Sequence, residues 1–396
     1  MISHLYILFF FFVTIRASSY LHPVIKCPEE DSIRKCLDQY HIKGPVNFRN
    51  NTVAYNKDLN FEYNLRVIHF PVAFVHPIDV FDVQNAIKCA VKLNFPIVAR
   101  SGGHSYEGYG LGDKDCSLVV DLETLNKIII DIASQTAIVE TGNKLESLYY
   151  ETNRHGFAFP AGVCPYVGVG GHITGGGVGH LNRIFGLSSD NVLDAQIVLA
   201  NGTIINSAKK YPELFWAIRG AGNAGYGIIT TLTLRIYPIQ KIATRVALLY
   251  DFDQTPLVIS VMNQLGGNLH RNLTVLIRIS SDAPTTVEGI YLGSANESQP
   301  YLQEFIKLSK PKSITYFEND LYSILTEGKE STKTPGFYKV KSFFIDSTGL
   351  SYEGIKYFMS FTKSIKCAVN NHVMLLNGGK VNDIRRNETA FIHRDN

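Results

Sequence analysis

Two glycine-rich stretches carry the residues best suited to chemistry in this sequence. The longer runs from Phe159 to His180 and holds eight glycines, one cysteine (Cys164) and the histidines His172 and His180. Glycine loses more conformational freedom on folding than any other residue, so this density indicates a backbone that must approach something closely. The usual need is to bring N–H groups close to an anion. A flexible loop is the alternative, but proline, aromatic and β-branched residues interleave with the glycines, so we interpret the run as lining a ligand.

The second stretch follows the apolar residues Phe95 to Val98 and runs from Ala99 to Gly112. A strand that ends in Arg100, Ser101, Gly102 and Gly103 would present N–H groups and one cation, which suits a diphosphate. No Gly-x-Gly-x-x-Gly opens a helix after a strand here, so this is not the Rossmann fingerprint. Taken alone, His104 is equally well explained by a hydrogen bond within the loop, and Cys164 by a small buried thiol.

Together the stretches resemble the flavoproteins related to berberine bridge enzyme and glucooligosaccharide oxidase, within the vanillyl-alcohol-oxidase group. Four motifs in order carry the resemblance: 100–106, 161–172, 187–194 and 213–220. It covers residues 30–240 well and the remainder thinly. It implies an α+β fold, in which a two-subdomain PCMH-type FAD-binding domain precedes a substrate domain with an antiparallel sheet.

The resemblance also implies FAD held by two covalent bonds, from His104 to the flavin 8-methyl group and from Cys164 to ring carbon 6. Such tethers raise the reduction potential and favour hydride abstraction from alcohols and hemiacetals, chemistry that belongs to the cofactor. Val167 matches a position where valine accompanies reaction with oxygen, and Tyr106 would line the substrate cavity. The other residues expected to bind the cofactor are Arg100, Ser101, Gly102, Gly103, Ser105, Gly162, Gly168, Gly170, Gly171, His172, Gly175, Gly227 and Ile228.

Three functions follow as alternatives. The first is a secreted oxidase that converts a carbohydrate lactol or other alcohol with O2 and releases H2O2. The second changes the substrate to an alkaloid or a phenolic alcohol, and the third is a non-catalytic flavin-binding glycoprotein. A general base is required to take the hydroxyl proton; Asp346 and Asp383 are possible, but nothing in the sequence selects them. Members of the resembled family continue beyond the point where this chain stops, so an incomplete substrate domain is expected.

Periodicity and turn residues predict the elements that position these motifs. Residues 1–19, a short apolar run followed by small residues, predict a signal peptide. An N-terminal segment (20–66) then precedes the FAD-binding domain (67–240) and a partial substrate domain (241–396). The main predicted elements are helices at 79–93, 145–155, 301–308 and 350–365, strands at 95–99, 117–122, 228–237, 243–250 and 273–279, and a hairpin at 128–140.

Composition excludes some classes of partner. The 396 residues carry a net charge of +3 with scattered Lys and Arg, which gives no nucleic-acid footprint. No segment after residue 19 is apolar enough to cross a membrane. Five sequons, starting at Asn50, Asn201, Asn272, Asn296 and Asn387, favour secretion.

Cysteine spacing and the single tryptophan complete the expectations. The chain has six cysteines and no Cys-x-x-Cys, so a zinc site is not expected. The resemblance suggests a disulfide between Cys36 and Cys89, while the pairing of Cys27, Cys116 and Cys367 stays open. Trp216, the only tryptophan, is expected in the core.

Overall fold

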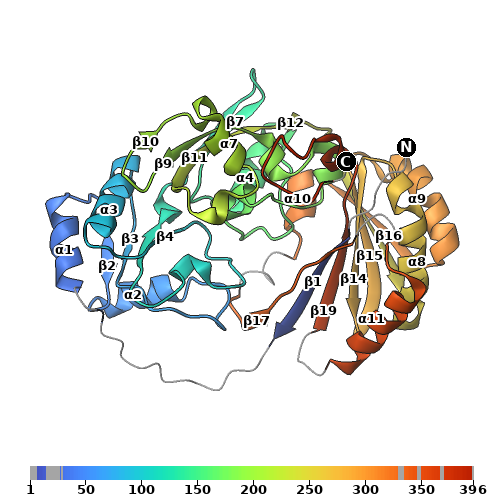
Figure 1. The fold of residues 1–396 in the computed structure, drawn as a ribbon. Helices are drawn as coiled ribbons and strands as arrows, with labels where there is room; N and C mark the ends of the chain where they lie inside the picture. Colours follow the sequence, from blue (N-terminus) through green and yellow to red (C-terminus); the bar gives the residue numbers. More distant parts are fainter. Residues whose placement is uncertain are drawn as a thin grey trace.

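The computed structural model describes residues 7–14, 27, 30–328, 334–345, 349–365 and 370–394, and in this part of the chain three main sheets follow one another across the molecule (Figure 1). The first sheet has the order β2-β3-β5-β4, with β2 antiparallel to β3 and the other pairs parallel. Helices α1 (Glu30–Gln39) and α3 (Val80–Lys92) pack beside it. Its strands are β2 (Val46–Phe48), β3 (Ala73–Val75), β4 (Ile97–Arg100) and β5 (Leu118–Asp121).

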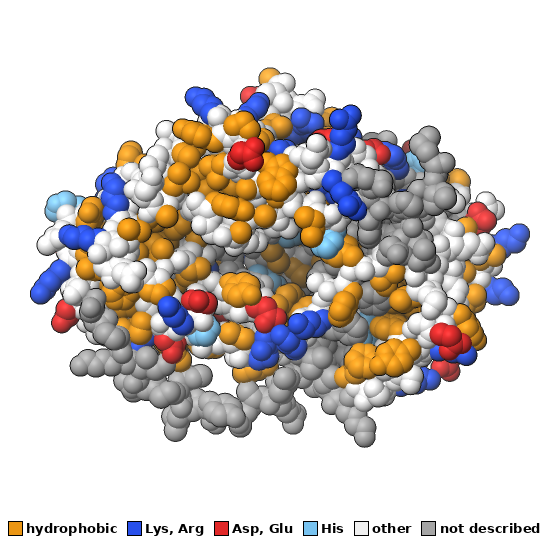
Figure 2. Space-filling model, viewed as in Figure 1, with side chains coloured by type: hydrophobic (Ala, Val, Ile, Leu, Met, Phe, Trp, Pro, Cys, Tyr) orange, Lys and Arg blue, Asp and Glu red, His pale blue; other side chains and the backbone are white. Residues whose placement is uncertain are grey.

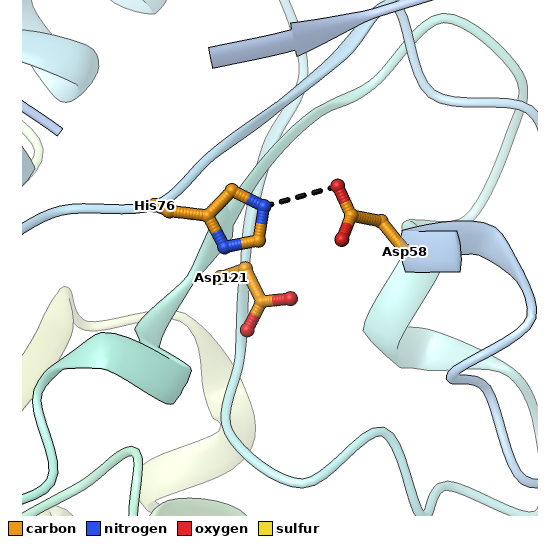
Figure 3. A group of neighbouring side chains, drawn as sticks. All are labelled: Asp58, His76 and Asp121. Atoms are coloured by element: carbon orange, nitrogen blue, oxygen red, sulfur yellow. Dashed lines mark hydrogen bonds and ion pairs between the residues drawn. The ribbon is translucent and has the colours of Figure 1, made fainter. Parts of the chain in front are cut away.

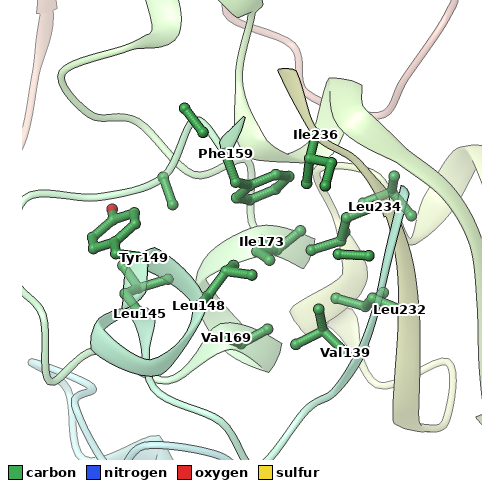
Figure 4. Packing of buried hydrophobic residues seen from close by; sticks show 14 of the residues in the cluster. Val139, Leu145, Leu148, Tyr149, Phe159, Val169, Ile173, Leu232, Leu234 and Ile236 are labelled. Carbon is green, nitrogen blue, oxygen red and sulfur yellow. The ribbon is translucent and has the colours of Figure 1, made fainter. Parts of the chain in front are cut away.

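The second sheet is antiparallel, with the order β10-β9-β11-β7-β6. Figure 4 shows its core, in which Leu148 of α4 (Leu145–Arg154) and Ile173 of α5 (Val169–Thr174) face Leu232 and Leu234. This packing fixes both ends of the longer glycine-rich stretch. The strands are β6 (Ile128–Asp131), β7 (Thr136–Glu140), β9 (Val192–Val198), β10 (Ile204–Ile205) and β11 (Ile228–Arg235).

The third sheet is antiparallel, with the order β16-β13-β15-β14-β19-β1-β17, and β18 also pairs with β1. Helices α8 (Thr255–Leu265), α9 (Ala295–Ser309) and α11 (Tyr352–Ser364) cover one face, and the other turns toward the first two sheets (Figure 1). The strands are β1 (Ile7–Thr14), β13 (Ala243–Tyr250), β14 (Leu273–Ser280), β15 (Ala283–Tyr291), β16 (Ser313–Asn319), β17 (Tyr338–Lys339), β18 (Phe344–Ile345) and β19 (Asn370–Leu376).

The predicted elements agree with the structure over most of the chain. Asp79 caps α3 by accepting from the N–H groups of Phe81 and Asp82 at 2.9 and 3.0 Å, which explains where that helix begins. Helix α4 ends before Gly156, whose φ of 79° favours glycine. The predicted α+β architecture, with two subdomains followed by an antiparallel sheet, agrees with the structure.

The structure uses the N-terminal apolar run differently from the prediction. We predicted a signal peptide over 1–19, whereas Ile7–Thr14 forms β1 and pairs with β19 over seven residues. The run consists of Ile, Leu, Phe, Val and Thr, which suit a strand as well as they suit a signal segment. Cleavage of this segment stays a prediction.

Two disulfides tie the N-terminal segment to the first sheet. The Cys36–Cys89 bond suggested by the resemblance is present, and Cys27 pairs with Cys116, which the sequence had left open. Cys164 is a free thiol, and Cys367 lies outside the described residues.

The expectation for Trp216 is wrong, because this residue is 40% exposed near the end of the short helix α7 (Pro212–Ala217).

In the part of the chain that the structure describes, we find no helix with the length and hydropathy needed to span a bilayer.

Candidate functional site

The two glycine-rich stretches meet at Gly102 and Gly168. A Cβ on Gly102 would lie 2.3 Å from the nitrogen of Gly168, and one on Gly168 would lie 2.2 Å from the nitrogen of Gly102. Ser101 joins the same contact, because its Oγ accepts from Gly170 N–H at 3.1 Å and donates to the carbonyl of Thr141. The predicted loops are therefore two sides of one site, and neither glycine can carry a side chain there.

A cavity of about 250 Å³ opens beside this contact. The face of the molecule in Figure 2 is hollowed at its centre, where histidine side chains are visible. The volume falls just below the roughly 300–1,000 Å³ of small-molecule pockets. The cavity is lined by Asn60, Phe61, Tyr63, Gly102, His104, Lys144, Tyr166 and Pro335.

His104 lies within a group of tyrosine rings. Tyr63 stacks on its imidazole with ring centroids 3.7 Å apart and planes at 16°, and Tyr338 stacks on Tyr63 at 4.9 Å and 5°. Tyr106 stands edge-on to His104, at 6.1 Å and 89°. Offset and edge-on contacts are the favoured geometries of aromatic pairs, so this group holds the imidazole plane in place.

The Cys164 loop reaches the same cavity. Tyr166, two residues after Cys164, lines that cavity together with His104 and Tyr63. Burial raises the pKa of Cys164, against the guanidinium of Arg278, which lowers it. The structure thus brings the His104 loop and the Cys164 loop to one site.

His172 sits behind the glycine run as a neutral imidazole. Burial, and then the nearby charge of His104, lower its pKa to about 4. A Cβ on Gly162 would lie 2.6 Å from its Cε1, and its enclosed Nε2 has no hydrogen-bond partner within the described residues. A buried nitrogen without a partner is unfavourable, so this atom suits a polar group of a bound ligand.

Arg100 does not face the cavity, contrary to our expectation of a cation for a diphosphate. Its Nε and Nη2 donate to Asp121 Oδ2 at 3.1 and 2.5 Å, and its Nη1 donates to the carbonyl of Asp58 at 2.7 Å. The side chain is fully buried. The reason is strand register: Arg100 on β4 is paired with Asp121 on the parallel neighbour β5, so its charge braces the loop from behind.

Asp121 also belongs to a cluster with Asp58 and His76, drawn in Figure 3. The ligand atoms lie within 4.8 Å of one another, close enough for a metal ion. Asp58 Oδ2, however, already bonds His76 Nε2 at 3.0 Å and Asn47 Nδ2 at 2.7 Å, and Arg100 holds Asp121. These bonds fill the positions that an ion would need, so we interpret the cluster as a buried charge network.

The other predicted residues surround the contact in different roles. Val167 is half-buried against the core of the second sheet, and its carbonyl accepts from Leu145 N–H at 3.0 Å. Gly171 lies open, with nothing within 4 Å of an added Cβ. Gly227 lies against the carbonyl of Val198, where an added Cβ would be 2.5 Å away. The rest support the turns: Ser105 Oγ accepts from Glu107 N–H, Gly103 has a φ of 59°, Gly175 ends α5, and Ile228 is buried at the start of β11.

Neither aspartate considered as a general base is supported. Asp383 is exposed and binds Arg271 through both oxygens at 2.7 and 3.0 Å, and this hydrogen bonding lowers its pKa. Asp346 lies outside the described residues. Both belong to the thinly matched half of the chain, where no motif separated them from other acids.

Sequence reasoning missed Tyr63, Lys144 and Tyr338. Lys144 lines the cavity, with its Nζ 4.4 Å from the Phe61 ring centroid, and supplies the cation that Arg100 does not. Tyr63 and Tyr338 lie far from the glycine motifs in sequence, so only the fold brings them to His104. No local signal marks them.

Comparison with known proteins shows which family the chain belongs to. A family model described as FAD binding domain matches residues 71–208. Tetrahydroberberine oxidase of Berberis wilsoniae is 31% identical, over 91% of this chain and 74% of that protein. Berberine bridge enzyme-like 27 of Arabidopsis thaliana is 29% identical, and the match covers 82% of this chain but only 63% of the relative. The solved structure of a chitooligosaccharide oxidase superposes with a TM-score of 0.80 at 25% identity, covering 92% of this chain and 80% of that one.

The chain belongs to the berberine bridge enzyme-like family of FAD-dependent oxidoreductases. The residues present fit that cofactor, because the cavity beside Gly102 and the open position at Gly171 leave room for a ligand, and His172 offers an enclosed nitrogen without a partner among the described residues. Gly102, Gly168, Ser101 and Lys144 would hold the diphosphate side, while His104 and Cys164 would hold the ring.

Proposed function

We propose that the chain is a flavoprotein oxidase that holds FAD covalently through both His104 and Cys164. The observation that carries this proposal is that both residues belong to one site: Tyr63 stacks on His104 at 3.7 Å, and Tyr166, two residues after Cys164, lines the same cavity as His104 and Tyr63. Each attachment replaces one flavin hydrogen with a bond to nitrogen or sulfur. This is a two-electron oxidation whose electrons pass to O2.

Bound FAD would accept a hydride from the substrate, and O2 would then reoxidise the flavin with release of H2O2. The chain's own residues position that chemistry. Tyr106 offers an aromatic wall edge-on to His104. Val167, a small side chain next to Gly168, is the residue that we propose admits O2. The substrate we propose is a carbohydrate lactol or another alcohol, supported by the structural similarity to the chitooligosaccharide oxidase.

We propose that the face of the third sheet turned toward the glycine run forms the opposite wall of the substrate site. Leu276 of β14 contacts Val178 of the glycine run, and Arg278, two residues further on, shares that face. Arg278 Nε donates to Glu288 Oε1 at 3.0 Å. Burial lowers the pKa of the nearby His180 to about 4, and the charge of Glu288 opposes this shift. A charged wall of this kind suits a hydroxyl-rich substrate. An alkaloid or phenolic alcohol is the alternative substrate, supported by the relative from Berberis.

We also propose that the protein is secreted and glycosylated. Two disulfides are characteristic of an oxidising compartment. The sequon residues Asn50, Asn201, Asn296 and Asn387 are exposed, where a glycan could be attached, and Asn272 is half-buried.

The test is acid precipitation of the purified protein, followed by absorption spectra of pellet and supernatant. We expect yellow colour in the pellet, retained by His104→Ala and by Cys164→Ala but lost when both are changed. Peroxide release is then measured on oligosaccharides and on aromatic alcohols. Colour only in the supernatant would refute covalent attachment, and retained flavin without turnover of any probe would favour the non-catalytic alternative.

A further inference from the structure

Tyr63 is bound to the His104 turn at two points. Its ring covers one face of the imidazole at 3.7 Å, and its backbone N–H donates to the carbonyl of Gly103 at 2.8 Å. Gly103 directly precedes His104, so the ring contact and the backbone contact act on the same turn. A histidine whose ring is stacked in this way loses most of its freedom to rotate about its side-chain bonds.

A segment from the third part of the chain holds Tyr63 from the opposite side. We call this segment, Thr334–Val340, the strap. Tyr338 stacks on the outer face of Tyr63, and Gly336 N–H donates to the carbonyl of Tyr63 at 2.9 Å. Asn64 also holds Tyr338, because its Oδ1 accepts from Tyr338 N–H at 2.9 Å and its Nδ2 donates to the Tyr338 carbonyl at 3.0 Å.

Ion pairs close the strap onto the same loop. Glu107 accepts from Arg66 at 3.1 Å and from Lys339 at 3.0 Å, so one carboxylate joins the N-terminal segment, the His104 loop and the strap. Arg66 Nε also donates to the Tyr338 carbonyl at 2.8 Å. Most of these bonds involve the backbone of Tyr338, and its ring is left to contact Tyr63 and Tyr106.

We propose that Tyr63 is a positioning residue for His104 and that the strap keeps Tyr63 in place. This inference rests on the proposed function, in which His104 attaches to FAD. A reacting group must be held within about 0.5 Å and 10–20° of its productive geometry. A displacement of about 1 Å can slow a reaction roughly 100-fold. The ring of Tyr63 provides that restraint.

The first experiment measures how fast flavin becomes acid-stable in two backgrounds. In Cys164→Ala the only tether is His104, and in His104→Ala it is Cys164. We expect Tyr63→Ala to slow attachment roughly tenfold or more in the first background and to leave the second within about twofold. Tyr63→Phe keeps the ring and should restore the rate. Equal losses in both backgrounds would overturn the proposal, because they would show a general structural role.

The second experiment does not depend on flavin attachment. Flavin-free full-length protein is treated with diethyl pyrocarbonate, and modification of His104 is followed by peptide mass spectrometry, with the exposed His41 as internal reference. Removing the stacked ring in Tyr63→Ala should raise His104 modification roughly three- to tenfold. Tyr63→Phe should match the wild type. Unchanged reactivity in Tyr63→Ala would overturn the positioning role even if the wild type attached no flavin, an outcome that would separately refute the proposed function.

Tyr338→Ala tests the role of the strap, including the case in which Tyr63→Ala does not fold. This change removes the outer ring while preserving the backbone bonds of the strap to Asn64 and Arg66. We expect an intermediate gain in His104 modification. Tyr352→Ala, an equally drastic change at a site 67% exposed on α11, is the matched control and should have no effect. A Tyr338→Ala variant indistinguishable from this control would contradict the role of the strap.

Discussion

Two fully buried arginine–aspartate pairs lie behind the site, and they differ in what surrounds them. Arg100 binds Asp121 from the neighbouring strand, 21 residues away, whereas Arg394 binds Asp190 across 204 residues of sequence. Arg394 also donates to Thr389 Oγ1 at 2.8 Å, and Asp190 Oδ2 accepts from Leu187 N–H at 2.8 Å. The first pair is local, and the second joins the last described residues to the loop after the glycine run.

Neighbouring charges give the two pairs different energetics. Near Arg100 lies Glu62, fully buried, with no hydrogen-bond partner for either carboxylate oxygen among the described residues. Burial raises the pKa of Glu62 to about 8. The charge of Arg100 opposes this shift, and the charge of Asp121 adds to it. No comparable third carboxyl is buried beside Arg394 in the described structure. A buried pair is therefore defined by its whole charge neighbourhood, and the Arg100 pair has a titratable neighbour in Glu62.

The largest expected effect comes from removing one partner of each pair. Arg100→Met and Arg394→Met each leave a buried carboxylate uncompensated, which costs about 3–5 kcal/mol. We expect the loss to become greater for Arg100→Met as the pH rises above about 8, because Glu62 then ionises and Arg100 is the charge that favours its ionised form. Denaturant unfolding at pH 7 and at pH 8.5 measures both, with the exposed Arg385→Met as control. A larger loss for Arg394→Met would mean that the long-range connection outweighs the local charge surplus.

Glu62→Gln tests the role of this carboxyl through the pH dependence of the free energy of unfolding. Between the ordinary glutamate pKa of 4.5 and the raised value of about 8, the folded state holds a proton that the unfolded state has released. Stability is therefore lost as pH rises through this window. The neutral amide removes that loss, so the variant should match the wild type near pH 4.5 and exceed it by roughly 1–3 kcal/mol at pH 8.

The measurement is a series of unfolding free energies from pH 4.5 to 8.5. Glu107→Gln is a matched change at a carboxylate paired with Arg66 and Lys339. The hydrogen bond from Lys339 lowers the pKa of Glu107 below its ordinary value of 4.5, so its contribution to stability is lost only at lower pH, and Glu107→Gln should leave the slope between pH 4.5 and 8.5 unchanged. Parallel curves for wild type and Glu62→Gln would show that Glu62 is ionised throughout.

The same contrast shows how far the sequence could predict the site. The resemblance carried by the His104 and Cys164 motifs implied that the two loops share one ligand, and the contact between Gly102 and Gly168 agrees with this. Arg100 was assigned to the wrong side, since its burial depends on pairing with Asp121 in a neighbouring strand. Tyr63 and Tyr338 could not be found, because their contact with His104 depends on where the third part of the chain packs. Short-range chemistry was visible in the sequence, whereas partners fixed by register or packing were not.

The smallest expected effect concerns an arginine–aspartate pair at the surface. Arg271 binds both carboxylate oxygens of Asp383, at 2.7 and 3.0 Å, as Arg394 does those of Asp190. Both side chains of the Arg271–Asp383 pair are substantially exposed. Water screens such pairs, so Asp383→Asn should cost about 0–1 kcal/mol, and the difference should shrink further in high salt. Denaturant unfolding at two salt concentrations, beside Arg394→Met, measures this directly. A loss comparable to that of Arg394→Met would show that geometry rather than burial sets the strength of these pairs, and the contrast between the two buried clusters would then lose its physical basis.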